Sequence, residues 1–195
     1  MNRYFTADTH FGSDRTRILS KRAFKSTEEM DQAFINNWNS LISKDDIVYH
    51  LGDFGEFKNV KKLNGNIVLI LGNYEKSEMK EKFNNNFDHY KDYLKTYGFN
   101  EIYENNIELV IKGRILNLTH EPLDCVKDKF NLFGHIHKLQ LVKSFGLNVG
   151  IDCHNYLPIN EDEVEFYLNA IEKFYDKNVF CTESDIEKDN IPFLS

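Results

Sequence analysis

Five short stretches of the chain carry oxygen and nitrogen ligands where β-strands are predicted to end. Each stretch follows or closes an apolar run; Gly72-Asn73, for example, directly follows the five apolar residues 67–71. Because parallel α/β sheets form their sites beyond the carboxyl ends of their strands, we expect these stretches to converge. They supply seven candidate metal ligands: Asp8, His10, Asp53, Asn73, His120, His135 and His137.

This mixture of carboxylate, imidazole and amide ligands favours two divalent metal ions of the Mn, Fe or Zn type over Ca²⁺ or a thiolate-bound metal. A carboxylate shared by two ions about 3.5–4 Å apart would form a clamp for in-line displacement at phosphorus. A nucleophilic serine is then unnecessary. The residue types therefore point to metal-assisted hydrolysis of a phosphate ester.

Residue periodicity predicts the elements that must position these ligands. A capping box of Ser26 and Glu29 opens a predicted helix over residues 27–43, and three acidic residues at 161–163 open a last helix. Short helices are expected at 60–63 and within the charged, aromatic segment 75–97. Strands are predicted at residues 3–7, 47–51, 67–71, 107–111, 115–118, 131–133 and 147–151.

These elements predict an α/β fold with two packed mixed β-sheets flanked by helices. No repeat, linker or break in composition divides the chain, so a single domain is expected over residues 1–195. The stretch from about residue 182 has no clear pattern and is expected to be either a loose tail or a final edge strand.

Composition limits the class of protein. The net charge of −7 argues against a surface that coats nucleic acid, although a metal could still attract a nucleotide. No apolar stretch approaches the roughly 18 residues of a membrane span, and no signal peptide is evident, so a cytoplasmic protein is expected. The three cysteines are widely spaced and form neither a disulfide framework nor a CxxC site; Cys153 is interpreted as a small packed residue rather than a ligand.

The ligand-bearing stretches resemble, in order and rough spacing, the motif blocks of calcineurin-like metallophosphoesterases. They read DTHFG, YHLGDF, LILGN, LTHEPL and LFGHIH, and the later stretch NVGIDCHNYLPI over residues 148–159 is similar to small, single-domain bacterial and phage members. The resemblance covers roughly residues 3–170. It implies a metallophosphoesterase-type α/β/β/α sandwich.

The resemblance also implies a role for each ligand. Asp8, His10 and His137 would bind the first metal, and Asp53 would bridge both metals. Asn73, His120 and His135 would bind the second. A metal-bound hydroxide would then attack phosphorus in a phosphodiester or phosphomonoester.

One position departs from the family pattern. The third block usually reads Gly-Asn-His followed by an acid, but here Tyr74 stands between Asn73 and Glu75. The missing histidine normally contacts the scissile phosphate and helps to protonate the leaving group. A tyrosine, with an ordinary pKa near 10, is a poorer proton donor at neutral pH. We therefore predict intact metal binding, with catalytic roles for Asn73 and Tyr74 but activity that is reduced or restricted to good leaving groups.

Substrate contacts are predicted from position alone. Arg15, Arg17 and Arg22 form a basic cluster after the first motif, which reads either as a solvated loop or as a phosphate clamp. His154 and Asn155 are candidates for facing the substrate, and Asp152 is expected near the site. His50 is expected to pack inside a strand, and His89 to lie on the surface.

The favoured function is a dinuclear metal-dependent phosphoesterase acting on a small phosphorylated or nucleotide-like substrate, without a membrane partner. A nucleic-acid polymer is a less favoured substrate because the chain is acidic. The alternative is a catalytically weakened metal-binding scaffold that holds a nucleotide or a protein partner. Tyr74 is the residue that favours this alternative.

Overall fold

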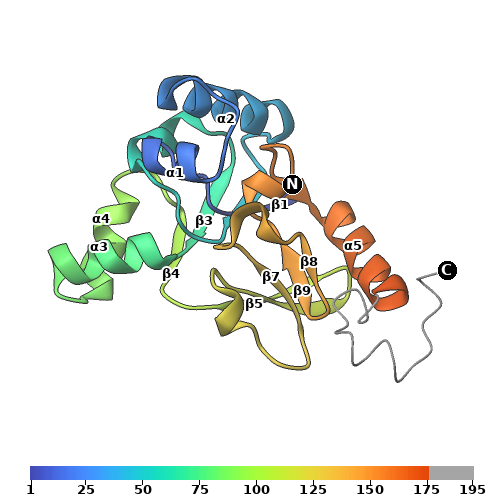
Figure 1. Ribbon diagram of the computed structural model, residues 1–195. Helices are drawn as coiled ribbons and strands as arrows, with labels where there is room; N and C mark the ends of the chain where they lie inside the picture. The colour runs from blue at the N-terminus through green and yellow to red at the C-terminus, as the bar shows by residue number, and fades with distance from the viewer. Residues whose placement is uncertain (176–195) are drawn as a thin grey trace, which may run out of the picture.

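Two five-stranded sheets lie face to face in the computed structural model, which describes residues 1–175 (Figure 1). Both sheets are mixed, so the predicted α/β class with two packed sheets is confirmed. The segment from about residue 182, for which a loose tail or an edge strand was predicted, lies outside the described residues.

The first sheet has a parallel centre. Strands β1 to β4 run parallel, and β10 pairs antiparallel with β1 at one edge. The second sheet places β6, β7 and β9 parallel to one another, with β5 and β8 antiparallel at its two edges. In sheet order, the strands are β10 (Ile159–Asn160), β1 (Arg3–Thr6), β2 (Ile47–His50), β3 (Asn66–Ile70) and β4 (Glu101–Tyr103), then β5 (Ile107–Ile111), β6 (Arg114–Leu118), β7 (Phe130–Phe133), β9 (Gly146–Asn148) and β8 (Val142–Lys143).

The helices begin where side chains cap them. Ser26 accepts a hydrogen bond from the Glu29 amide and opens α2 (Thr27–Leu41), while Asn160 caps α5 (Glu161–Phe174). The segment predicted to hold one or two helices forms two, α3 (Asn73–Phe83) and α4 (Phe87–Lys95). Short 3₁₀ turns occupy residues 57–62, 122–124, 137–139 and 151–153.

One helix was missed from the sequence. The basic segment interpreted as a loop contains α1 (Asp14–Leu19), because Ser13 caps it by accepting the Thr16 amide. The predicted strand at 147–151 ends early at Asn148, and Ile151 begins a 3₁₀ turn instead.

Alternate strand residues feed two hydrophobic cores. One core lies between the first sheet and helices α2 and α4, with Trp38 and Tyr90 among its fully buried side chains. The other lies between the two sheets and takes in α5, with Phe5 from β1, Leu132 from β7 and Leu168 from α5 among its buried side chains. Helices α2, α3 and α4 therefore pack against the first sheet, and α5 lies on the opposite side of the molecule from α3 and α4 (Figure 1).

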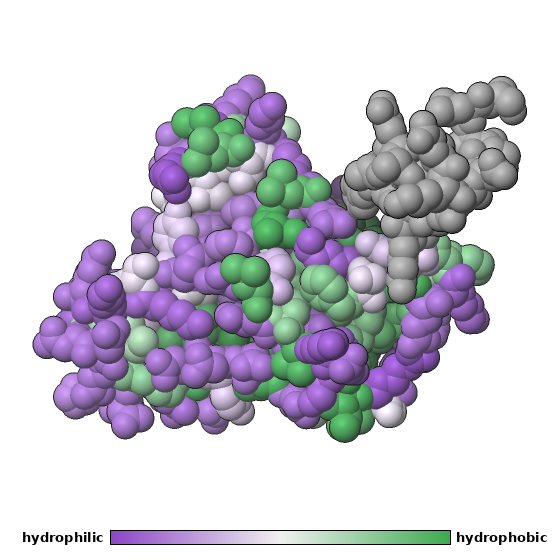
Figure 2. All heavy atoms as spheres, turned by 60° about the horizontal axis from the view of Figure 1, so that its bottom comes forward, coloured by the Kyte–Doolittle hydropathy of each residue, from purple (hydrophilic) through white to green (hydrophobic). Residues whose placement is uncertain are grey.

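The outer surface is mainly hydrophilic on the face drawn in Figure 2, where apolar side chains gather only in small groups. Within residues 1–175, no helix combines the length and apolar character needed to cross a membrane.

The two sheets join at the carboxyl ends of their parallel strands. Ala7, at the end of β1, forms an isolated parallel bridge with Gly150, just beyond β9. The Asp8 amide donates to the Gly52 carbonyl oxygen, and the Gly134 amide donates to that of His120. All five ligand-bearing stretches therefore meet along one edge.

Candidate metal centre

The backbone at this edge adopts a conformation that most residues avoid. Five of the seven predicted ligands have positive φ angles between 47° and 70°: Asp8, His10, Asp53, His135 and His137. Non-glycine residues in this left-handed region are uncommon and gather at functional sites. The strands end in sharp left-handed turns that direct the ligand side chains toward one another.

The first set of side chains comprises Asp8, His10 and His137, here named the Asp8 group. One ligand atom from each residue lies within 4.8 Å of the others. Asp8 and His10 are buried, and both oxygens of Asp8 accept from the His135 amide at 2.9–3.0 Å. The rings of His10 and His137 stack with their centroids 5.2 Å apart.

The second set, here named the Asp53 group, comprises Asp53, His120 and His135, whose ligand atoms likewise lie within 4.8 Å of one another. Asn73 completes it, because its Oδ1 lies 3.0 Å from both His120 Nε2 and His135 Nδ1. His120 Nε2 and His135 Nδ1 are 3.2 Å apart.

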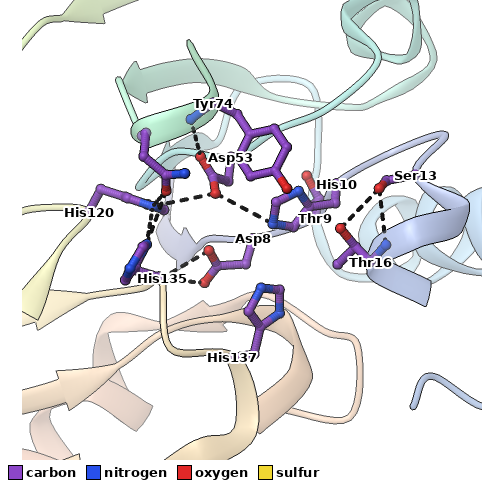
Figure 3. Close-up of polar contacts among 12 residues, drawn as sticks. Asp8, Thr9, His10, Ser13, Thr16, Asp53, Tyr74, His120, His135 and His137 are labelled. Atoms are coloured by element: carbon purple, nitrogen blue, oxygen red, sulfur yellow. Dashed lines mark hydrogen bonds and ion pairs between the residues drawn. The ribbon is translucent and has the colours of Figure 1, made fainter. Parts of the chain in front are cut away.

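Asp53 lies between the two groups. Its Oδ2 is 3.5 Å from His10 Nε2 and equally 3.5 Å from His120 Nε2, as Figure 3 shows. Its Oδ1 accepts the Tyr74 amide at 3.0 Å, which fixes the carboxylate. A single side chain thus reaches one nitrogen of each group, as a bridging ligand must.

The donor atoms fit divalent cations. His120 Nδ1 lies 2.6 Å from the Leu51 carbonyl oxygen and must donate to it, so in the neutral ring Nε2 presents a lone pair toward the Asn73 oxygen. His10 Nε2 is buried and has no hydrogen-bond partner within the described residues. Buried nitrogens and oxygens normally have partners, and a cation would supply one to each of these atoms.

Burial and charge shift the pKa values in the same place. Burial raises the pKa of Asp8 to about 6 and lowers that of His10 to about 3. Burial opposes protonation of His120, but the carboxylates of Asp53 and Asp8 raise its pKa to about 9. Burial would raise the pKa of Asp53, yet His120 and His10 lower it overall. Without metal, the protonated His120 ring therefore lies beside the Asp53 carboxylate.

Two glycines allow the strand ends to approach. A Cβ atom at Gly52, which has a φ of +87°, would lie 2.5 Å from the Gly72 backbone and 2.7 Å from His120 Nδ1. One at Gly72 would lie 2.4 Å from Asp53 Oδ1. Because such contacts are sterically forbidden, only glycine permits this spacing.

A buried ion pair that the sequence did not reveal supports the Asp8 group. Arg22 Nε and Nη2 donate to the Asp152 carboxylate at 2.8 and 2.9 Å, and Arg22 also donates to the carbonyl oxygens of Asp8 and Thr9. His137 Nδ1 lies 2.6 Å from Asp152 Oδ2 and donates to it. The His137 ring is thereby oriented with Nε2 available to a metal.

We expect Asp152→Asn to weaken metal binding by the Asp8 group about 10–100-fold, because carboxylates behind ligating histidines contribute that much. Competition with a chelating indicator dye would measure both affinities of the purified protein. Asp45→Asn, an exposed change in the turn before β2, is the control and should leave both unchanged. Two unaltered affinities in Asp152→Asn would refute this role.

Glu75 holds the two neighbouring strand ends. Its Oε2 accepts the amides of Asp53 and Gly72 at 2.8 and 2.9 Å, and its Oε1 accepts the Phe54 amide at 2.8 Å. The side chain is 2% exposed. It thus ties the turn after β2 to the start of α3, and fixes Asp53 next to Asn73.

Glu75→Gln is expected to lower the free energy of unfolding by about 1–3 kcal/mol, since the new amide group would face a backbone donor. Urea denaturation would measure the change. Glu81→Gln, an exposed change on the same helix, should stay within about 0.5 kcal/mol of the parent protein. Equal stability of the two variants would show that Glu75 does not stabilise the link between the turn after β2 and the start of α3.

A cavity of about 590 Å³ opens beside the centre, lined by Tyr74 and by the predicted ligands His10, Asp53 and His137 among others. Tyr74 is 45% exposed, and its ring forms a T-shaped pair with that of His10 at a centroid distance of 5.0 Å. Arg15 Nη1 donates to the Tyr74 hydroxyl oxygen at 2.8 Å. The Tyr74 proton therefore remains free to donate into the cavity.

The remaining predicted substrate residues lie elsewhere. Arg17 donates to Asp14 and to the Phe24 carbonyl oxygen, and Arg22 is buried, so only Arg15 of the basic cluster lines the cavity. His154 is buried with Nε2 2.8 Å from the Asn148 carbonyl oxygen, and Asn155 occupies a left-handed turn away from the cavity lining. The placement of these residues follows from tertiary contacts that spacing does not encode.

The remaining histidines and Cys153 lie where the sequence predicted. His50 is buried and its Nε2 lies 2.9 Å from the Thr9 hydroxyl, whereas His89 is exposed on α4. Cys153 is half-buried and donates to the His137 carbonyl oxygen, outside both ligand groups.

The chain matches known proteins over most of its length. A family model described as the calcineurin-like phosphoesterase superfamily domain matches residues 1–153. An uncharacterized protein of Methanocaldococcus jannaschii is 30% identical, with 87% of this chain and 91% of that protein covered. A protein of unknown function from Aquifex aeolicus has a similar fold, with a TM-score of 0.67, 23% identity and coverage of 85% of this chain and 98% of that chain. A novel archaeal phosphodiesterase aligns with a TM-score of 0.44, 19% identity and coverage of 77% and 82%.

Proposed function

This chain belongs to the calcineurin-like phosphoesterase superfamily, and from that premise we propose that it is a dinuclear metal-dependent phosphoesterase. The family match confirms the resemblance found in the motif blocks. The single observation that carries the proposal is the position of Asp53 Oδ2, 3.5 Å from a nitrogen of each ligand group. This position lets one carboxylate oxygen serve both ligand groups, as a bridging ligand would.

The chemistry divides between the ions and the chain. Two divalent ions of the Mn, Fe or Zn type, held by the Asp8 and Asp53 groups, would activate a water and neutralise charge on the phosphoryl oxygens. Asn73 extends the Asp53 group and faces the cavity. Tyr74 donates its hydroxyl proton toward the phosphoryl or leaving-group oxygen, and Arg15 orients that hydroxyl.

The proposed substrate is a small or nucleotide-like phosphodiester or phosphomonoester. The cavity of about 590 Å³ matches the volume of small-molecule sites. The net charge of −7 disfavours a long nucleic-acid polymer, which binds best to extended basic surfaces.

Hydrolysis of two chromogenic esters tests the proposal. Mn²⁺-loaded protein is incubated with bis-p-nitrophenyl phosphate and with p-nitrophenyl phosphate, and metal is then stripped and restored. We expect turnover that requires metal and is absent from Asp53→Asn. Turnover that survives both metal removal and the substitution would refute the mechanism.

A metal-binding scaffold is the second candidate, and Tyr74 in place of the usual histidine is the observation that favours it. The same experiment separates the two functions. Tight binding of two ions without hydrolysis of either ester would support the scaffold, whereas metal-dependent hydrolysis would exclude a purely structural role.

A further inference from the structure

Two segments far apart in sequence form the walls of the cavity beside the metal centre. Residues 15, 16 and 19–21, from α1 and the turn after it, line one part of the cavity, and residues 135–139 line another. The Lys138 ammonium donates to the Lys21 carbonyl oxygen at 3.3 Å and so joins the walls. The cavity therefore has a defined rim beyond the metal ligands.

The charge of this rim contrasts with that of the chain. Apart from the predicted ligands, the charged side chains that line the cavity are all cationic: Arg15, Lys21 and Lys138. Asp53 is the only carboxylate in the lining. Within residues 1–175, none of the three cations forms an ion pair. In a protein with 31 acidic and 24 basic residues, this local excess of positive charge would attract anions.

Each of the two lysines directly follows, in sequence, a residue at the Asp8 group. Lys138 directly follows His137, and Lys21 directly follows Ser20, whose hydroxyl lies 3.2 Å from His137 Nδ1. Arg15, in contrast, is engaged with Tyr74. The lysines are therefore close to the reaction centre, but no contact commits them to it.

Apolar side chains accompany the cations. Leu19 is 65% exposed and Leu139 is 86% exposed, and both line the same cavity, as does Ile136. Single exposed apolar residues need no explanation, but a pair flanking a cationic rim offers a surface for an apolar or planar group.

We propose that the substrate carries a second phosphate, bound by Lys21 and Lys138, and an apolar or planar group that packs between Leu19 and Leu139. A nucleoside bisphosphate ester has this chemistry. The proposal rests on the proposed function for the site of cleavage, with the scissile phosphate at the metal centre. It adds the recognition of a second anion by lysines on the rim of the cavity, next to the predicted metal ligands.

Two esters with the same scissile bond test the second anion. They are thymidine 5′-(4-nitrophenyl phosphate) and its 3′-phosphorylated form, which share a leaving group and differ by one phosphate. We expect kcat/KM to be about tenfold higher for the 3′-phosphorylated ester, corresponding to one phosphate contact of modest strength. This ratio should fall as ionic strength rises, because exposed charges are screened.

Lysine variants assign the preference to the rim. Lys21→Met and Lys138→Met should each lower the ratio, and the double variant should bring it close to one; any general loss of activity cancels in the ratio. Lys44→Met, an exposed change before β2 at the opposite end of the sheet, should keep the parent ratio. A parent ratio of one, or a ratio preserved in the double variant, would overturn the proposal.

Direct binding separates this proposal from the proposed function. Isothermal titration of the metal-loaded protein compares thymidine 3′,5′-bisphosphate with thymidine 5′-monophosphate. The bisphosphate is expected to bind more tightly, and the difference should require both lysines. If this result holds but neither ester is hydrolysed, the anion site is supported and only the esterase proposal fails. Equal affinity of the two nucleotides would refute the anion site.

Discussion

Asp53→Asn is expected to lower kcat at least about 10³-fold and to reduce the bound metal from two ions to one or none per chain. The carboxylate supplies the shared charge between the groups, and metal stabilisation of the transition state is worth several kcal/mol, at about 1.4 kcal/mol per tenfold. An asparagine keeps an oxygen in position to accept the Tyr74 amide, so the local fold should persist. Elemental analysis and ester hydrolysis would measure the two effects.

The matched control for this prediction is Asp45→Asn. Asp45 is exposed and lies before β2, whereas Asp53 lies after it, so the two substitutions flank the same strand. The control should retain two ions and full turnover. Two tightly bound ions in Asp53→Asn would show that Asp53 is not shared, even if turnover were lost.

Tyr74→His is expected to raise kcat on an ester with a poor leaving group, such as phenyl phosphate, by as much as about 10²-fold. An imidazole with an ordinary pKa near 6.5 delivers a proton at neutral pH far more readily than a phenol does. The side chain is 45% exposed, so the exchange leaves the hydrophobic cores intact. Kinetics on p-nitrophenyl and phenyl esters would measure the gain.

The dependence on leaving group makes this prediction specific. A p-nitrophenolate leaves with little need of a proton, so its ester should gain much less from the substitution. Metal affinity should remain at the parent value, because Tyr74 lies outside both ligand groups. Unchanged or lower activity on the phenyl ester would show that Tyr74 already provides all the proton donation that this site uses.

The sequence predicted the convergence of the strand ends because that inference needs only parallel strands and polar residues after them. The superfamily match and the two sheets confirm the family and the fold class. Strands β4, β8 and β10 were missed because strands of two or three residues carry too little periodicity to be recognised. Helix α1 was missed because its start depends on one local contact, between Ser13 and the Thr16 amide.

The spacing of residues in the sequence did not predict which side chains would be buried behind the metal ligands. A basic residue in a polar segment reads as solvated, yet Arg22 is 4% exposed and pairs with Asp152, 130 residues away. His154 behaves in the same way: it was expected to face the substrate, but its ring is buried and contacts the Asn148 carbonyl oxygen. In both cases the burial of the side chain depends on a hydrogen-bonding partner that residue type and spacing do not reveal: Asp152 for Arg22 and the Asn148 carbonyl for His154.

The left-handed backbone at the ligand positions changes how deletions there should be interpreted. Alanine at residue 8 or 137 would remove a donor atom but keep a Cβ atom in this disfavoured conformation, whereas glycine would remove the donor and relieve the strain. The difference in folding stability between the two truncations at one position isolates the conformational energy held by that turn.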